Sequence, residues 1–245
     1  MGERKHTTWE GFSAIESTFS DRSYILVKPH AGKGNGKWAL KTEYFGAFPA
    51  LEIELLKRGY HIAHIKTKTR WCLPEDTEAQ ADFVRFIHKE FELCKTCVPI
   101  GMSCGGMQSI YLAAKHPALV SCAYLDAPVL NLLSCPAGVG GREALLNREY
   151  AEFVEHRGMT VSELVPFREH PQDYLPQMVA ARIPVVLVSG DSDTIVPFHE
   201  NGRLLAEAYE EAGVPIEVHI KPGGDHHPHG LADNTLIADF IDRFS

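Results

Sequence analysis

Three short segments of this chain carry residue types that together could perform nucleophilic catalysis. The first is GMSCG, residues 101–105, which fits the pattern G-x-S-x-G. It follows an apolar run and precedes a helical pattern, so Ser103 is predicted to occupy a sharp turn between a strand and a helix. The glycines at its two sides leave room for such a turn. A serine hydroxyl becomes a nucleophile when a histidine accepts its proton and a carboxylate orients that histidine.

Two later segments supply the acid and the base. The apolar run 184–189 is followed by GDSDTIVP, and the run 216–221 is followed by PGGDHHPH. The order serine, then acid, then histidine is the one found along the chain when the serine occupies such a turn. We therefore predict a Ser-His-Asp triad at the carboxyl ends of three strands. The N–H of Cys104, at the start of the helix, is the first predicted donor to an oxyanion.

The elements that must position these residues alternate between strand and helix. This alternation predicts an α/β fold with a mostly parallel central sheet and helices on both faces. Strands are expected at 23–28, 60–65, 97–100, 121–126, 184–189 and 216–221, and helices at 49–59, 75–91, 106–115, 200–212 and 234–244.

One stretch interrupts the alternation. Residues 131–182 contain helical patterns and no convincing strand, and Thr160 to Glu163 reads as a helix capping box. We interpret 131–182 as a small helical cap inserted between two strands of a single domain that spans residues 1–245.

Composition narrows the possible partners. The formal net charge is -8 and no run of Lys or Arg stands out, which argues against a nucleic-acid partner. No stretch approaches the roughly 20 apolar residues of a membrane-spanning helix, and the N-terminal segment has no apolar run typical of a signal peptide. We expect a cytoplasmic protein that acts on a small molecule.

The segments GMSCGG, GDSDTIVP and PGGDHHPHGL together resemble the α/β-hydrolase superfamily. The resemblance extends over nearly the whole chain and implies the α/β-hydrolase fold. Within the superfamily, GKWALKTEYFGAFP, YLDAPV and HHPHGL look like a subgroup of bacterial serine esterases, whose members are often associated with carbohydrate metabolism.

The resemblance assigns roles by position. Ser103 matches the nucleophile, and Asp193, three residues after Gly190, matches the acid. Asp191 and Asp126 are alternative acids, the first being more typical of a turn and the second standing where some relatives place the acid.

His226 matches the histidine, with His227 as the competitor. The residue before this histidine is usually glycine, whereas here it is Asp225. In the superfamily, a loop also supplies a second oxyanion donor. We expect that donor in the loop after residues 23–28, from the backbone N–H of His30 or Ala31.

Two tryptophans are candidates for the substrate pocket. Trp38 and Trp71 could line it, or they could be packing residues, as aromatic side chains usually are.

The sequence implies neither a metal nor an organic cofactor. Asp225, His226, His227 and His229 could in principle bind zinc, but adjacent loop residues seldom all point at one ion. Residues 29–38 do not match a phosphate-binding loop, because Ala31 and Trp38 occupy a glycine and a hydroxyl position of that motif.

The predicted function is hydrolysis of a carboxylic ester with a small acyl group through an acyl-enzyme, with a carbohydrate as one candidate for the alcohol part. Two alternatives remain: a peptidase or amidase of the same fold, and a ligand-binding module on a hydrolase scaffold. Peptidases of this kind usually carry a large additional domain, for which this chain has no room.

Overall fold

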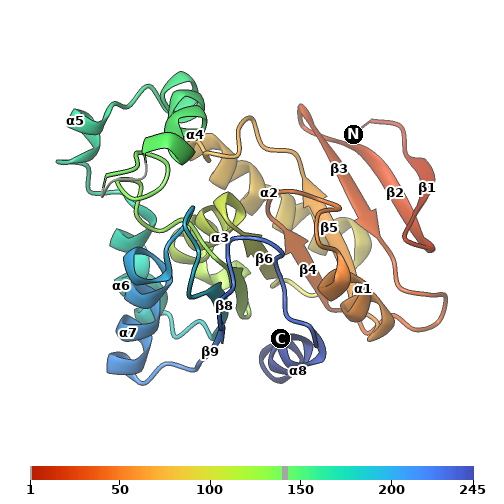
Figure 1. Cartoon of the computed structure of the whole chain (residues 1–245). Coiled ribbons are helices and arrows are strands. Elements are labelled where there is room, and N and C mark those ends of the chain that lie inside the picture. The colour runs from red at the N-terminus through yellow and green to blue at the C-terminus, as the bar shows by residue number, and fades with distance from the viewer. Residues whose placement is uncertain (1, 140–142) are drawn as a thin grey trace.

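The computed structural model describes residues 2–139 and 143–245 and shows a nine-stranded, mostly parallel sheet with helices on both faces (Figure 1). The strand order is β1-β2-β3-β5-β4-β6-β7-β8-β9. β1, β2 and β3 form an antiparallel meander that joins β5, and all further neighbours are parallel. This arrangement is the α/β-hydrolase fold predicted from the sequence.

The bounds of the strands agree with most of the predicted ones. They are β1 Lys5–Trp9, β2 Phe12–Phe19, β3 Arg22–Val27, β4 Trp38–Lys41, β5 His61–Ile65, β6 Val98–Met102, β7 Ala123–Asp126, β8 Val185–Gly190 and β9 Ile216–Lys221.

Helices cover both faces of the sheet. α1 (Ala50–Lys57) and α8 (Thr235–Phe244) pack together on one face, and α2, α3, α6 and α7 cover the other (Figure 1). The second group has the bounds α2 Pro74–Phe91, α3 Cys104–Lys115, α6 Leu175–Ala180 and α7 Gly202–Ala212, and three short 3-10 turns occupy Pro117–Leu119, Pro171–Tyr174 and Phe198–Glu200.

The central strands carry apolar runs because helices bury both faces of the sheet. In β8, Val185 and Leu187 belong to the hydrophobic cluster under α2, α3, α6 and α7, while Val186 and Val188 belong to the cluster under α1 and α8. Successive side chains of a strand point to opposite faces, so a strand buried on both sides needs apolar residues at every position.

The segment between β7 and β8, where the cap was predicted, is helical. It contains α4 (Glu143–Arg157), α5 (Val161–Leu164) and α6. The predicted capping box opens α5, where the Glu163 carboxylate accepts hydrogen bonds from the Thr160 N–H at 2.7 Å and from its hydroxyl at 2.8 Å. Residues 140–142 of this segment lie outside the described residues.

Three strands were not predicted. β1 (KHTTW) is the edge strand and is almost entirely polar, and β2 (FSAIESTF) beside it carries several polar residues, so neither has a clear apolar run. β4 was missed because it has only four residues and ends in Lys41, which is fully buried in an ion pair with Glu52 of α1. Within the described residues, no helix is long and apolar enough to cross a membrane.

Candidate active site

Ser103 occupies the predicted sharp turn between β6 and α3. Its backbone has φ 53° and ψ -119°, a left-handed conformation that non-glycine residues seldom adopt. Three hydrogen bonds hold this turn in place. The Ser103 N–H donates to the Asp126 carbonyl at 2.9 Å, and the Ser103 carbonyl accepts from the N–H groups of Gly106 at 2.9 Å and Val129 at 3.1 Å. The strained serine is therefore tied to the end of the neighbouring strand β7.

The glycines around Ser103 are required to different degrees. A Cβ atom on Gly101 would lie 2.4 Å from Ser109 Oγ and 2.5 Å from the Gly105 carbonyl oxygen. A Cβ on Gly106 would lie 2.4 Å from Pro128 Cβ, whereas one on Gly105 would find its nearest atom at 3.1 Å. The turn thus needs glycine most at 101 and 106, and less at the second glycine of the motif.

Ser103, His226 and Asp193 come together as a triad although they lie far apart in the sequence. His226 Nε2 lies 3.1 Å from Ser103 Oγ, and His226 Nδ1 lies 2.8 Å from Asp193 Oδ2. His226 and Asp193 are buried, with 4% and 5% of their surfaces exposed. An imidazole oriented in this way can accept the serine proton and later return it to a leaving group.

Asp193 is itself fixed by the loop that carries it. Its second oxygen, Oδ1, accepts the N–H groups of Ile195 at 2.9 Å and Val196 at 2.8 Å. The alternative acid Asp191 is exposed and accepts the Gly223 N–H at 2.7 Å, so it forms part of a turn.

Asp225 stands where the superfamily usually has glycine, and it joins the acid loop to the histidine loop. Its Oδ1 accepts the N–H groups of His226 at 2.7 Å and Thr194 at 3.2 Å. These hydrogen bonds hold the pKa of Asp225 below its ordinary value. The departure from the usual pattern therefore leaves the histidine in register.

Asp126, the third candidate acid, pairs with a different histidine. Its Oδ1 lies 2.8 Å from His229 Nδ1, and its Oδ2 accepts the Gly230 N–H at 2.6 Å and the Tyr124 hydroxyl at 2.7 Å. Burial alone would raise the pKa of Asp126, but the His229 and Gly230 hydrogen bonds lower it below the ordinary value. A second histidine–carboxylate pair thus lies beside the triad.

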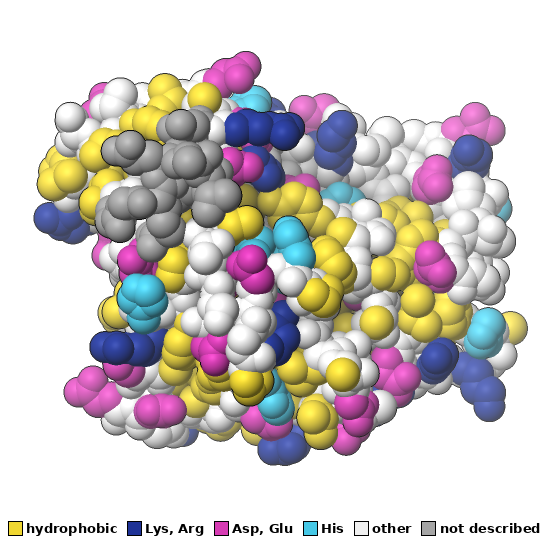
Figure 2. All heavy atoms as spheres, viewed as in Figure 1, with side chains coloured by type: hydrophobic (Ala, Val, Ile, Leu, Met, Phe, Trp, Pro, Cys, Tyr) yellow, Lys and Arg dark blue, Asp and Glu magenta, His cyan; other side chains and the backbone are white. Residues whose placement is uncertain are grey.

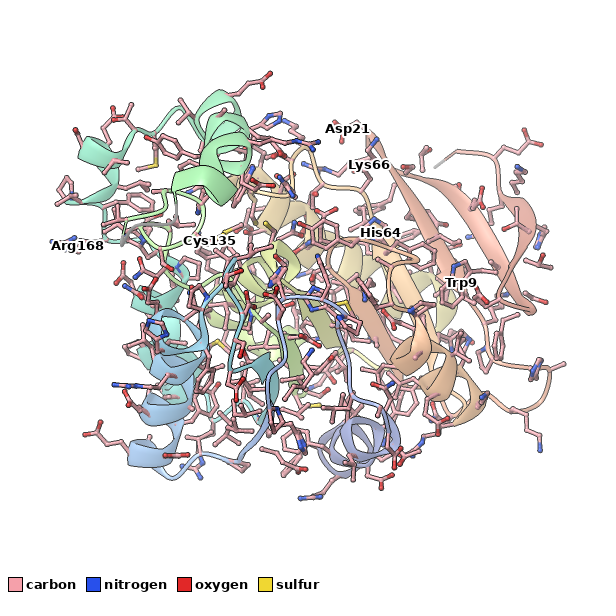
Figure 3. All side chains as sticks on the ribbon, viewed as in Figure 1. Trp9, Asp21, His64, Lys66, Cys135 and Arg168 are labelled. Carbon is pink, nitrogen blue, oxygen red and sulfur yellow. The ribbon has the colours of Figure 1, made fainter. Side chains whose placement is uncertain are left out.

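The triad opens into a cavity of about 180 Å³ at the carboxyl edge of the sheet. Figure 2 shows histidine side chains near the centre of this face, with hydrophobic side chains next to them. Cys135, buried in the segment between β7 and β8, lines the cavity (Figure 3). Glu149 of α4 lines it too, so this segment contributes to the walls of the site. The other lining residues include Tyr44, Phe48, Arg70, Trp71, Cys104 and Ile195.

Cys104 occupies the position predicted for an oxyanion donor. It is the first residue of α3, where backbone N–H groups have no partner within the helix. Its side chain is a packing residue, because burial raises the pKa of the thiol to about 11.

The prediction of His30 or Ala31 as the second donor is wrong. β3 runs antiparallel to β5, with Val27 opposite Ile62, so the loop after β3 emerges at the amino edge of the parallel strands. His30 stacks there on Phe12, at the far end of the sheet from Ser103.

The loop that reaches the site follows β4 instead, and it carries Tyr44. This residue lines the cavity with Ser103, and burial raises the pKa of its phenol, which therefore stays protonated. The Tyr44 backbone N–H is already engaged by the Glu43 carboxylate at 3.3 Å, and its hydroxyl interacts with the Cys104 thiol and the Arg70 guanidinium. Sequence reasoning missed Tyr44 because it missed β4.

The two tryptophans have different surroundings. Trp38 lies in β4, is 1% exposed and donates its Nε1–H to the Cys94 carbonyl at 2.9 Å, so its assignment to the pocket is wrong. Trp71 lines the cavity, packs edge-on against Phe153 of α4 and carries the Arg70 guanidinium over its ring.

Three imidazoles converge at the site, contrary to the expectation that adjacent loop residues diverge. One nitrogen from each of His226, His227 and His229 lies within 4.8 Å of the others, which makes them the candidate metal ligands among the described residues. Two of the three, His226 and His229, already use Nδ1 on a carboxylate.

Comparisons with known proteins agree with this geometry. A sequence model of the prolyl oligopeptidase family matches residues 76–244, well over half of the chain. The chain belongs to this family. Its fold also resembles that of solved α/β hydrolases.

Three such structures illustrate the range of solved proteins with a similar fold. Dipeptidyl peptidase 4 of Porphyromonas gingivalis has 14% identity and a TM-score of 0.68, and the match covers 100% of this chain and 36% of that one. An esterase of Pyrococcus furiosus has 18% identity and a TM-score of 0.67, with 99% of this chain and 96% of that one covered. An α/β hydrolase from a lagoon-sediment metagenome has 16% identity and a TM-score of 0.59, with 93% of this chain and 98% of that one covered. The chain spans about a third of the length of the dipeptidyl peptidases that it matches.

Proposed function

We propose that this protein is a serine esterase that hydrolyses carboxylic esters of small acyl groups through an acyl-enzyme. The observation that carries the proposal is the continuous hydrogen-bonded chain from Ser103 through His226 to Asp193 at the wall of a cavity. An intact triad of this kind argues against a module that only binds a ligand.

The reaction proceeds in two stages. Ser103 Oγ attacks the acyl carbon while its proton passes to His226 Nε2, and the oxyanion accepts hydrogen bonds from the Cys104 N–H and the Tyr44 hydroxyl. His226 then protonates the leaving alcohol, which departs. In the second stage, His226 takes a proton from water, whose oxygen attacks the acyl carbon. The bond between the acyl carbon and Ser103 Oγ then breaks, His226 returns the proton to Oγ, and the carboxylic acid leaves.

The size of the triad cavity favours a small acyl group. A cavity of about 180 Å³ lies below the roughly 300–1,000 Å³ of sites that enclose drug-sized ligands. Relatives of similar length also include an esterase, since the Pyrococcus furiosus enzyme is covered over 96% of its length. The second candidate is a peptidase or amidase, which the family membership and the dipeptidyl peptidases among the structural relatives favour.

A leaving-group comparison separates the two candidates. Wild type and Ser103→Ala would be assayed with p-nitrophenyl esters of two to eight acyl carbons and with p-nitroanilides of single amino acids and dipeptides. An esterase hydrolyses the acetyl and propionyl esters, loses kcat/KM as the acyl chain grows, and leaves the anilides intact. Cleavage of an anilide at a rate comparable to the acetyl ester would contradict the esterase proposal and support the peptidase.

A further inference from the structure

We infer that His229, held by Asp126, binds a free hydroxyl group on the alcohol part of the substrate, next to the ester oxygen. This inference rests on the proposed esterase function and names the chemical class of the alcohol: a polyol esterified at one oxygen with a free hydroxyl on a neighbouring carbon.

The tautomer of His229 follows from its partner. Asp126 is fully buried, and its Oδ2 accepts the Gly230 N–H and the Tyr124 hydroxyl, so this carboxylate is surrounded by donors and both of its oxygens accept hydrogen bonds. The contact of 2.8 Å between His229 Nδ1 and Asp126 Oδ1 therefore requires the proton on Nδ1. In the neutral imidazole, Nε2 is then a hydrogen-bond acceptor with a fixed direction.

The His229 imidazole borders the reaction site. Its side chain is only 3% exposed, yet it lines both the triad cavity and an adjoining cavity of about 430 Å³. Among the residues whose side chains the structure describes, none makes a hydrogen bond to Nε2, and this atom is not sealed inside the protein. A buried, oriented acceptor that opens onto the cavity calls for a hydrogen-bond donor from the ligand.

The position of His229 places that donor on the alcohol side of the ester. His226 must protonate the leaving oxygen, so this oxygen lies within hydrogen-bond reach of His226 Nε2. The rings of His226 and His229 lie 5.0 Å apart, centroid to centroid, and are nearly perpendicular. A hydroxyl one carbon away from the ester-bearing carbon can therefore reach His229 while the ester oxygen stays beside His226.

A purely structural role for His229 would leave part of this arrangement unexplained. Asp126 already ties down the histidine loop by accepting the Gly230 N–H, and this bond does not involve the imidazole. The neighbouring His227 has no carboxylate partner among the described residues, is exposed and stacks on Phe48. His227 therefore serves as a matched control: an imidazole in the same cavity wall without an orienting acid.

The test compares three acetate esters of nearly equal size. 2-Hydroxyethyl acetate offers a donor, 2-methoxyethyl acetate offers only an acceptor, and propyl acetate offers neither. Wild type is expected to favour the hydroxyethyl ester over both others by about tenfold in kcat/KM, the value of one good neutral hydrogen bond. His229→Ala should reduce this ratio to about one, whereas His227→Ala should keep the ratio.

Removal of the His229 imidazole could disturb the histidine loop, so a second variant tests the assignment with the imidazole in place. In Asp126→Asn, the amide oxygen can keep the bonds from Gly230 and Tyr124, and the amide NH₂ then faces His229 Nδ1. The proton moves to Nε2, which becomes a donor, so the preference for hydroxyl over methoxy should disappear in a variant that retains His229.

Each other outcome has a defined meaning. Hydrolysis of all three esters at similar rates by wild type, or an unchanged preference in His229→Ala, would overturn the assignment and leave the esterase function intact. An equal loss of kcat for all three esters in His229→Ala would instead place His229 on the hydrolytic water and would also overturn it. Hydrolysis of none of the esters by wild type would overturn the proposed esterase function and this assignment with it.

Discussion

The substitution Asp193→Asn tests how the acid acts on the triad, because the structure fixes which way the new amide must face. Asp193 Oδ1 accepts two backbone N–H groups, from Ile195 and Val196. The amide oxygen of an asparagine can keep both bonds, whereas its NH₂ cannot accept either of them. The NH₂ must therefore take the place of Oδ2, which lies 2.8 Å from His226 Nδ1.

The exchange of an acceptor for a donor at this position changes which nitrogen of His226 carries the proton. A donor facing Nδ1 requires an unprotonated Nδ1, so the proton of the neutral imidazole resides on Nε2. Nε2 then donates to Ser103 Oγ, 3.1 Å away, and can no longer accept its proton. In serine hydrolases this reversal lowers kcat by about 10⁴-fold, which corresponds to about 5 kcal/mol of lost transition-state stabilisation.

The assay measures kcat/KM for p-nitrophenyl acetate together with the thermal midpoint of unfolding. We expect the fall of about 10⁴-fold with a midpoint within a few degrees of wild type, because the loop keeps its two backbone bonds. Asp191→Asn is the matched control, since this exposed carboxylate contacts the Gly223 N–H and not the histidine; its activity should stay within about twofold. A loss of less than tenfold in Asp193→Asn would refute the reasoning, because the tautomer would then not depend on Asp193.

Three further predictions concern the surroundings of the triad. Tyr44→Phe should lower kcat by about 10²–10³-fold with little change in KM, as for other oxyanion donors, and an unchanged kcat would remove its hydroxyl from the mechanism. Gly101→Ala places a Cβ 2.5 Å from the Gly105 carbonyl oxygen and should lower the free energy of unfolding in urea by about 1–3 kcal/mol. Gly105→Ala, whose Cβ has its nearest contact at 3.1 Å, should lower it clearly less, and equal losses would contradict the packing argument. Burial and the charge of Lys28 lower the pKa of His61 to about 4, so the stability contributed by its neutral imidazole is present above about pH 6.5 and is lost as the pH falls toward 4. Between about pH 7 and about pH 4.5, the thermal midpoint of unfolding should therefore fall less in His61→Gln than in wild type. An equal fall would argue against a buried neutral imidazole.

The residues of the triad could be predicted from the sequence because each stands directly after a strand with a clear pattern. β6 and β8 are continuous apolar runs, and the turns that follow them contain few candidates of the required type. The parallel sheet brings the carboxyl ends of such strands to one edge, so local patterns were enough to predict that Ser103, Asp193 and His226 meet.

The proposed second oxyanion donor, Tyr44, could not be predicted because its position depends on β4. Trp38 and Lys41 make this four-residue strand look like part of a loop, and Lys41 is tolerated inside only because Glu52, eleven residues later on α1, neutralises it. Without β4 in the sheet, the loop after β3 was the only one left to supply a donor, although the antiparallel pairing of β3 sends that loop to the opposite edge.

The pairing of His229 with Asp126 could not be predicted from the sequence either. Asp126 was considered as a partner for the triad histidine, and His229 as a metal ligand. The two residues lie 103 positions apart, and no local pattern distinguishes the histidine that meets Asp126 from the one that meets Asp193. Their partners are decided by how the loop after β9 passes over the ends of β7 and β8.

The most direct test of the central claim is covalent labelling of Ser103. A fluorophosphonate probe would be added to the wild-type protein, and the modified residue would be located by peptide mass spectrometry, with His226→Ala as the control. An activated serine gives one equivalent of adduct on Ser103 and almost none in the control, because the imidazole 3.1 Å from Oγ is then missing. An unlabelled wild-type protein, or labelling that persists in His226→Ala, would contradict the assignment of Ser103 as the nucleophile of a working hydrolase.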